Sequence, residues 1–312
     1  MSEFNHIPVL LVECLEGLNI KDGGIYVDAT VGGAGHSSRI LEQLKTGGHL
    51  YGFDQDSIAI EIARERLSKI SPRFTLIHAN FKDMKGELFT RGISKVNGIL
   101  FDLGVSSPQL DNAERGFSYN HDAVLDMRMD KRQEFSAYTL VNTWREKDIA
   151  DIIYRYGEER FAKQIARKIC EYREKQKITT TFQLVDIIKQ AIPVSRKREA
   201  GHPAKKTFQA IRIAVNDELN VLAKGLKDAL TLLDKGGRLC VITFHSLEDR
   251  IVKELFKSSS SFAPWKRGMP LTIEQVEVDY KVITKKPILP SQEELDFNRR
   301  SHSAKLRIIE KI

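Results

Sequence analysis

The stretch VDATVGGAGHS, residues 27–37, decides the fold, because an apolar run ends there at an acid and is followed by three glycines. With Gly24-Ile25-Tyr26 before it and an amphipathic segment at 39–44 after it, the stretch predicts a strand, a tight turn and a helix. Glycine lets the backbone approach a ligand closely, and the free amides at the start of a helix can donate to that ligand. Residues 33–38 are an imperfect G-x-G-x-x-G motif, so the turn either binds a nucleotide-like ligand or serves only chain geometry.

An acid follows at the distance expected for a nucleotide site. A second strand is predicted at residues 49–54, and it ends at Asp54. In dinucleotide-binding units a carboxylate ~20 residues after the glycines binds the ribose hydroxyls. The alternative is that Asp54 is an N-cap or turn aspartate before the helix expected to begin near Ser57.

Strands and helices alternate on both sides of a long helical region. Further strands are predicted at residues 74–80, 96–102, 238–244, 280–284 and 304–309. The alternation indicates an α/β fold with a doubly wound parallel sheet, in which ligands lie at the carboxyl ends of the strands. The residues at or just past such ends are Asp28, Asp54, Phe81 and Asp102.

The region between residues 110 and 206 has no convincing buried strand. Apolar residues recur there at helical spacing, in one stripe from Ile149 to Tyr156 and another from Phe161 to Tyr172, which indicates packed helices. A further helix is predicted at 181–191, and one long helix continues from Phe208 to about Asp234. We therefore expect a discontinuous α/β domain, residues 1–109 and 207–312, interrupted by a helical domain at 110–206.

Composition narrows the class of protein. The chain has 312 residues, 41% of them hydrophobic, which is enough for a large core. Its three cysteines are far apart and its histidines lack ligand spacing, so neither a disulfide framework nor a metal site is expected. No signal peptide pattern and no membrane-length apolar run is present, which favours a cytoplasmic protein that does not enter a membrane.

The charge of the chain favours a polyanionic partner. The formal net charge is +7 and the isoelectric point is about 9.1. The densest basic stretch lies at the end of the helical region, and with one later arginine it supplies the candidate RNA-binding residues Arg196, Lys197, Arg198, Lys205, Lys206 and Arg212. A solvated surface without a partner is the alternative.

Long ordered motifs follow the fourth predicted strand: DLGVSSPQLD at 102–111, ERGFS at 114–118 and LDMRM at 125–129. Together they resemble those of the bacterial small-subunit ribosomal RNA cytosine-N4 methyltransferases, the methyltransferase H family. The resemblance extends over almost the whole chain through further motifs: HIPVLL at 6–11, GEER at 157–160, HPA at 202–204, TFQA at 207–210 and FHSLEDR at 244–250. One departure is Arg299, where relatives commonly carry proline.

The resemblance implies a Rossmann-like class I methyltransferase domain with an inserted helical substrate-recognition domain. It implies S-adenosylmethionine as cofactor and, as substrate, a cytidine in the decoding region of 16S rRNA within the small ribosomal subunit. Carried over by position, the cofactor-binding residues are Ala34, Gly35, His36, Asp54, Phe81, Asp102 and Gln109. A monomer and a homodimer both stay open.

The N4 amine of cytosine is a poor nucleophile, because its lone pair is delocalised into the ring. The site must therefore position the amine and accept its hydrogens. Residues 107–109 look like a relic of the D/N/S-P-P-aromatic loop of amino-group methyltransferases. We expect Ser106 or Ser107 to accept from N4 unless they form only a turn, and Asp102 to order either the methionine end of the cofactor or the amine. A base could stack on one of three rings: Phe117, Tyr119 or Phe244.

Three other functions stay open at this point. A nicotinamide-dependent oxidoreductase would use the glycine turn and Asp54 equally well, although the loop after the fourth strand argues against it. A non-catalytic ribosome-assembly or RNA-binding factor could keep the pocket as a relic. A methyltransferase acting on DNA amines would need the same chemistry.

Overall fold

The computed structural model describes residues 8–106, 109–110, 112–193, 201–261 and 278–312. The chain forms two compact units, one of residues 1–104 and 219–312 and the other of residues 105–218. The first unit is an α/β domain and the second is helical.

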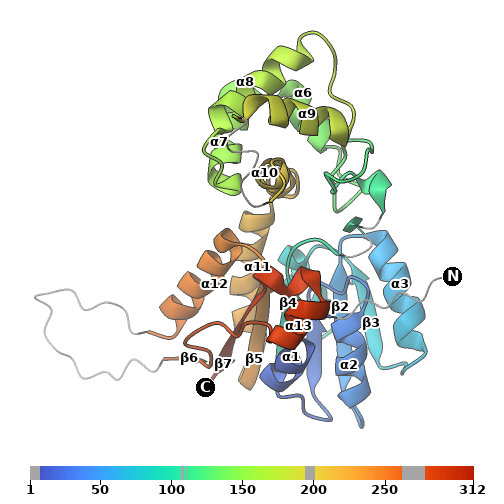
Figure 1. Cartoon of the computed structure of the whole chain (residues 1–312). Coiled ribbons are helices and arrows are strands. Elements are labelled where there is room, and N and C mark those ends of the chain that lie inside the picture. Colours follow the sequence, from blue (N-terminus) through green and yellow to red (C-terminus); the bar gives the residue numbers. More distant parts are fainter. Residues whose placement is uncertain (1–7, 107–108, 111, 194–200, 262–277) are drawn as a thin grey trace, which may run out of the picture. The chain divides into compact units, whose positions relative to one another are not determined.

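A seven-stranded sheet with the order β3-β2-β1-β4-β5-β7-β6 forms the centre of the first unit (Figure 1). Its strands are β1 (Ile25–Asp28), β2 (His49–Asp54), β3 (Phe74–His78), β4 (Val96–Asp102), β5 (Leu233–Thr243), β6 (Tyr280–Val282) and β7 (Lys305–Lys311). β1 to β5 are parallel, whereas β7 is antiparallel to both neighbours. The α/β fold is confirmed, but the sheet is mixed and not purely parallel as predicted. The prediction missed this because an apolar run does not reveal the direction of a strand.

Helices connect the strands of this sheet. They are α1 (Leu11–Leu18), α2 (Gly35–Gln43), α3 (Ser57–Ser68), α4 (Met84–Phe89), α11 (Glu218–Leu232), α12 (Ser246–Ser259) and α13 (Gln292–Phe297), with 3-10 turns η1 (Phe81–Asp83) and η3 (Arg299–Ser303). Among the described helices, none combines the length and the apolar character that crossing a membrane requires.

Both faces of the sheet are buried. In β4, Ile99 and Phe101 belong to one apolar cluster, while Leu100 between them belongs to another. Successive side chains of a strand point to opposite faces, so one strand anchors both layers. This is why residues 99–101 of β4 form an unbroken apolar run, which ends at Asp102.

The second unit contains η2 (Ala113–Arg115), α6 (Ala137–Thr143), α7 (Glu146–Gly157), α8 (Ala162–Arg173), α9 (Thr181–Ala191) and α10 (Lys205–Asn216). The isoleucines of the two predicted stripes, such as Ile149, Ile153, Ile165 and Ile169, are fully buried in its core. The stripes therefore pack helix against helix, as expected.

The single long helix predicted from residue 208 to residue 234 is wrong. Asp217 has a left-handed conformation, φ 49°, which ends α10 at Asn216, and a separate helix, α11, begins at Glu218. Phe208 and Ile211 of α10 are buried in the helical core. The α/β unit therefore resumes at residue 219 and not at residue 207, and its first segment ends at residue 104 instead of 109.

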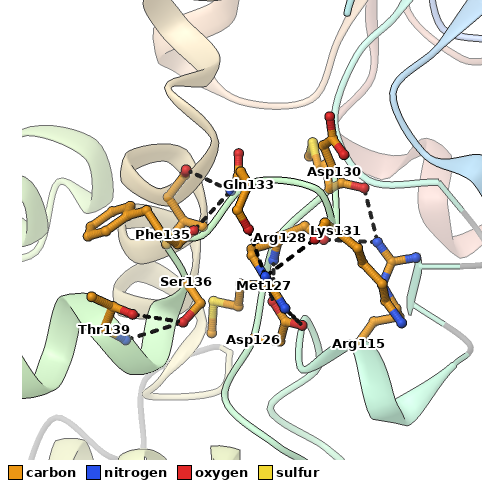
Figure 2. Close-up of polar contacts among 12 residues, drawn as sticks. Arg115, Asp126, Met127, Arg128, Asp130, Lys131, Gln133, Phe135, Ser136 and Thr139 are labelled. Atoms are coloured by element: carbon orange, nitrogen blue, oxygen red, sulfur yellow. Dashed lines mark hydrogen bonds and ion pairs between the residues drawn. The ribbon is translucent and has the colours of Figure 1, made fainter. Parts of the chain in front are cut away.

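A buried arginine and a buried asparagine hold the loop before α6, and Figure 2 shows the arginine, Arg115, beside this loop. Arg115, which is 1% exposed, donates to the carbonyl oxygens of Arg128 and Met129 at 2.9 and 3.1 Å. Asn216 at the end of α10 donates to the Met127 carbonyl and accepts from the Met129 amide, both at 2.8 Å. Met127 has φ 59°, so these bonds keep a left-handed residue in place. The motifs ERGFS and LDMRM thus form one structural unit.

The close approach of β4 to Tyr26 can be tested at Gly98. A Cβ at Gly98 would lie 2.8 Å from the Tyr26 ring and 3.1 Å from Leu18. We expect Gly98→Ala to lower the free energy of unfolding by ~2 kcal/mol through overpacking, measured by urea denaturation. Gly86→Ala in α4 is the control, because a Cβ there meets no atom within 4 Å and should stabilise the helix by ~0.5–1 kcal/mol. Equal effects of the two substitutions would contradict this packing.

Candidate active site

Three aspartates lie along one edge of the sheet. Asp28, Asp54 and Asp102 are the last residues of β1, β2 and β4. These strands are parallel neighbours in the order β2-β1-β4, so their carboxyl ends meet. Ligands of open α/β sheets bind at this edge.

Asp28 joins the end of β1 to the start of α2. It is 1% exposed, and its carboxylate accepts from the Ser37 hydroxyl at 2.6 Å and from the Thr30 amide at 3.1 Å. Burial raises the pKa of Asp28 to about 6, although both hydrogen bonds favour the ionised form. Asp28 is therefore a structural acid that closes the turn.

The glycine turn exposes backbone on one side and packs on the other. Gly32 and Ala34 are left-handed, with φ 49° and 59°. A Cβ at Gly33 would meet no atom within 4 Å, whereas one at Gly35 would collide with the Pro8 ring. The turn thus leaves open space beside Gly33, and Gly35 admits the segment that precedes α1.

Asp54 lies beneath this turn. Its Oδ2 accepts from the Gly32 amide and its Oδ1 from the Asp56 amide, both at 2.9 Å. Burial raises the pKa of Asp54 to about 6. Asp56 caps α3, by accepting from the Ile58 amide at 3.1 Å, so Asp54 is not the helix cap. Its bond from the amide two residues on is that of a turn aspartate, which is the other half of that alternative. Each oxygen of Asp54 keeps a lone pair for further donors such as ribose hydroxyls.

Phe81 lies just beyond β3, as the first residue of η1. Its ring packs edge-on against Phe101, with 5.2 Å between the centroids. A Cβ at Gly225 of α11 would lie 2.7 Å from the same ring. The backbone of α11 therefore sets where Phe81 lies, and Gly225 is a residue that the sequence analysis missed.

Asp102 meets His36 at the end of β4. His36 Nδ1 lies 3.5 Å from Asp102 Oδ2, and its Nε2 lies 3.0 Å from the carbonyl oxygen of Val9. The Asp102 amide donates to the Thr30 hydroxyl at 2.7 Å. The other carboxyl oxygen, Oδ1, is buried and has no hydrogen-bond partner among the described residues. Burial, with the charges of Asp28 and Glu248, raises the pKa of Asp102 to about 8.

The residues after β5 extend this edge. Glu248, which is 3% exposed, accepts from the backbone amides of Phe244 and His245 at 2.8 and 3.3 Å. The Phe244 ring is half-buried and lies in the same unit as Asp102. Glu248 therefore fixes the backbone that carries an accessible ring.

Gln109 and Ser106 belong to the second unit, whereas Asp28, Asp54, Phe81 and Asp102 belong to the first. The Gln109 side chain accepts from the Ser106 amide at 3.1 Å, and the Ser106 carbonyl accepts from the amides of Gln109 and Leu110. This is a turn, as the alternative interpretation expects. The Ser106 hydroxyl is buried without a partner among the described residues, and Ser107 lies outside them.

Two of the three candidate stacking rings are already packed. Tyr119 stacks on His202 with 4.5 Å between centroids and an interplanar angle of 8°, and Phe208 packs against it edge-on. Phe117 is 6% exposed in the helical core. Phe244 is the remaining candidate.

The candidate RNA-binding cations have different surroundings. Arg196, Lys197 and Arg198 lie outside the described residues. Lys205 and Lys206 are exposed in the first turn of α10, and the Lys206 ammonium donates to the Glu158 carbonyl at 3.1 Å. Arg212 is forked on Glu218 at 2.8 and 2.9 Å, so its charge is largely neutralised within the unit. We therefore expect Lys205 and Lys206 to contribute more than Arg212.

Four positioning residues escaped the sequence analysis: Thr30, Ser37, Gly225 and Glu248. Thr30 and Ser37 lie within the stretch 27–37. Hydroxyl residues so close to the strand-end acid Asp28 could have been predicted to form hydrogen bonds at this edge. Glu248 stands three residues after His245, which is capping-box spacing. Gly225 carried no local signal, because its role depends on a ring far away in the sequence.

Comparison with known proteins identifies the family. The sequence profile described as the MraW methylase family matches residues 3–312. The chain belongs to the MraW methylase family. A ribosomal RNA small subunit methyltransferase H from Exiguobacterium sibiricum is 58% identical over 309 residues, covering 99% of each chain. One from Limosilactobacillus fermentum is 54% identical over 314 residues, covering 100% of each chain.

Membership of a methylase family decides against the nicotinamide oxidoreductase. The site of this MraW family member also suits a nucleoside with a cationic amino-acid tail. Open space lies beside Gly33, Asp54 keeps acceptor capacity below it, and Asp102 Oδ1 is a buried acceptor without a partner among the described residues. These features fit S-adenosylmethionine, the cofactor of this class of methyltransferase.

The raised pKa of Asp102 leads to a stability prediction. A carboxyl whose pKa rises from 3.8 to about 8 on folding favours the folded state at low pH, and this contribution is lost as pH rises through that range. Asp102→Asn cannot ionise, so its free energy of unfolding relative to the unmodified chain should increase by ~2 kcal/mol between about pH 4 and pH 9, a value discounted for partial exposure. Urea denaturation across this pH range measures the difference. Asp22→Asn, at an exposed turn, is the control, and a parallel pH dependence in both variants would contradict the assignment.

The contact between Gly225 and Phe81 leads to a binding prediction. Gly225→Ala forces the Phe81 ring to move, so the Kd for S-adenosylmethionine in calorimetry should rise by ~10-fold, or ~1.4 kcal/mol. Phe81→Ala should show a similar loss, and Gly86→Ala no change. An unchanged affinity in Gly225→Ala would remove Phe81 from the cofactor site.

Proposed function

We propose that this chain transfers the methyl group of S-adenosylmethionine to the N4 amine of a cytidine in the decoding region of 16S rRNA, within the small ribosomal subunit. The observation that carries the proposal is Asp102 Oδ1, a buried acceptor without a partner among the described residues at the carboxyl end of β4. Membership of the MraW methylase family supports the reaction type. The names of the two relatives support ribosomal RNA of the small subunit as the substrate.

The chain's own residues would hold the donor at the sheet edge. Asp54 would accept from the ribose hydroxyls, the backbone of Ala34, Gly35 and His36 would bind the amino-acid tail, and Phe81 would offer an apolar ring to the base. The bound cofactor supplies a methyl group already activated by its attachment to a sulfonium. Catalysis by the protein then consists mainly of placing the amine in line with that methyl group.

An acceptor is needed for the amine. As an N4 hydrogen is drawn toward an acceptor, the nitrogen lone pair becomes less delocalised and more nucleophilic. Asp102 Oδ1 can supply this acceptor because its own hydrogen-bonding capacity is unused by the described residues. Ser106 and Ser107 stay candidates for a second acceptor. Gln109 stays a proposed cofactor contact.

The cytosine must leave the RNA structure to reach this edge. Extruding a base costs a few kcal/mol unless it is already unpaired, and stacking on a ring returns ~1–3 kcal/mol. Phe244, half-buried just after β5, is the candidate ring in the α/β unit. We assign RNA binding to the helical unit, with Lys205 and Lys206 contacting phosphates and Arg196, Lys197, Arg198 and Arg212 as further candidates. The ribosomal substrate places this activity in the cytoplasm.

The proposal is tested with unmodified small subunits. Purified chain, labelled S-adenosylmethionine and subunits should yield N4-methylcytidine at one position, located by mass mapping of nuclease fragments. Asp102→Ala should lower the rate by at least ~100-fold while the protein stays folded by circular dichroism. Asp22→Ala, an exposed aspartate at a turn, is the matched control.

Naked 16S rRNA and single-stranded DNA are compared as substrates in the same assay. Label on another nucleotide, or no transfer to any of these substrates, would overturn the proposed reaction. No transfer together with normal RNA binding would favour the assembly factor.

A further inference from the structure

Both ring nitrogens of His36 lie near oxygen atoms. The Val9 carbonyl can only accept, so Nε2, at 3.0 Å from it, carries a hydrogen. Nδ1 lies 3.5 Å from Asp102 Oδ2. A single proton between these two atoms, on either Nδ1 or Oδ2, removes the repulsion between their lone pairs.

The ring that makes these contacts is held firmly. His36 is 5% exposed in the first turn of α2. The segment before α1 supplies Val9, and it is fastened by the Leu10 amide, which donates to the buried Glu294 carboxylate of α13 at 3.0 Å. Pro8 packs on Gly35 immediately before His36. A segment near the N-terminus and a helix near the C-terminus thus hold one imidazole against Asp102.

We propose that His36 is a positioning residue that shares a proton with Asp102 Oδ2, so that Oδ1 can take up the proton that the substrate amine loses. The inference rests on the proposed function and deepens it. Without His36, a protonated Asp102 would have no further capacity for a proton. With His36, the pair can take up a second proton while the carboxyl is already protonated.

The proton balance of the step is complete. A nitrogen–carbon bond forms as the carbon–sulfur bond breaks, and the electron pair of the broken bond stays on sulfur. The amine nitrogen becomes cationic and loses one proton to Asp102 Oδ1, while the proton on Oδ2 moves to His36 Nδ1. The pair gains one positive charge as the sulfonium loses one, so the total charge of the site is unchanged.

The groups that face Asp102 favour this uptake. Asp28 comes from β1, Glu248 from α12, His36 from α2 and Cys14 from α1. The two acids raise the pKa of Asp102 and stabilise an additional positive charge on the pair. Burial of Oδ1 keeps bulk water from serving as the acceptor.

Two amide substitutions separate the contacts of His36. His36→Gln can place its amide near the Nε2 position and keep the bond to Val9, but it loses the partner of Asp102. His36→Asn can place its amide near Nδ1 and keep a contact to Asp102, but it cannot take up a proton. Calorimetry first gives the Kd of each variant for S-adenosylmethionine, and all rates are then measured at a saturating concentration of the cofactor.

The decisive measurement is the single-turnover rate against pH. In His36→Gln, Asp102 must be ionised to accept a proton, so with a pKa near 8 the rate at pH 7 should fall ~10-fold and recover toward pH 9. His36→Asn should behave in the same way, while the unmodified chain stays active at pH 7. A loss that is equal at every pH, or a change in cofactor affinity alone, would overturn the inference, since both indicate a merely structural role.

A second readout needs no substrate and separates this inference from the proposed function. In ¹⁵N NMR spectra the His36 signals, identified among the eight histidines by their loss in His36→Gln, should show Nε2–H and an Nδ1 shift displaced toward the protonated form. Asp102→Asn should return Nδ1 to the shift of a bare lone pair. An Nδ1 shift that does not respond to Asp102→Asn would overturn proton sharing even if methyl transfer is confirmed.

Discussion

The structure depends on keeping three carboxyl groups buried at one edge of a sheet. Burial alone would favour neutral acids, and the raised pKa values of Asp28, Asp54 and Asp102 record that cost. Asp28 and Asp54 each receive two hydrogen bonds, mostly from backbone amides of the turns that follow their strands. Asp102 Oδ1 receives none from the described residues. Two acids therefore build the edge, and the third is left with unused capacity for a ligand.

The shape of this edge is set by backbone approach more than by side chains. Gly33 leaves open space, Gly35 admits Pro8, and Gly225 admits the ring of Phe81. The contacts at Gly35 and Gly225 fasten α2, the segment before α1 and α11 around the same site. A methyl group at Gly35 or Gly225 would move a residue that the proposed chemistry uses, so packing and function are tied at these glycines.

Local patterns predicted most of the fold and part of the site. Most strands coincide with apolar runs, and the strand-end acids were visible because they interrupt such runs, but β5 begins at Leu233, within residues predicted to be helical. The break at Asp217 was not visible, since the apolar spacing of Phe208 and Ile211 continues across it and only the left-handed backbone conformation of Asp217 ends α10. The pairing of His36 with Asp102 and the packing of Gly225 on Phe81 depend on distances between segments, which periodicity does not encode. Arg212 was predicted to bind RNA because other basic residues precede it in the sequence. Its two hydrogen bonds to Glu218 show instead that its charge is largely neutralised within the unit.

Charge explains how such an edge binds the methyl donor more tightly than the thioether that remains after transfer. A sulfonium donor is cationic, whereas the thioether left after transfer is neutral. Buried acids attract the cation more strongly than the neutral product, because a low dielectric strengthens the interaction. The proton released by the amine would then remain on the His36–Asp102 pair until the product leaves and water reaches Oδ1. In this view the same acids that are costly to bury hold the donor, accept the proton and weaken the binding of the spent cofactor.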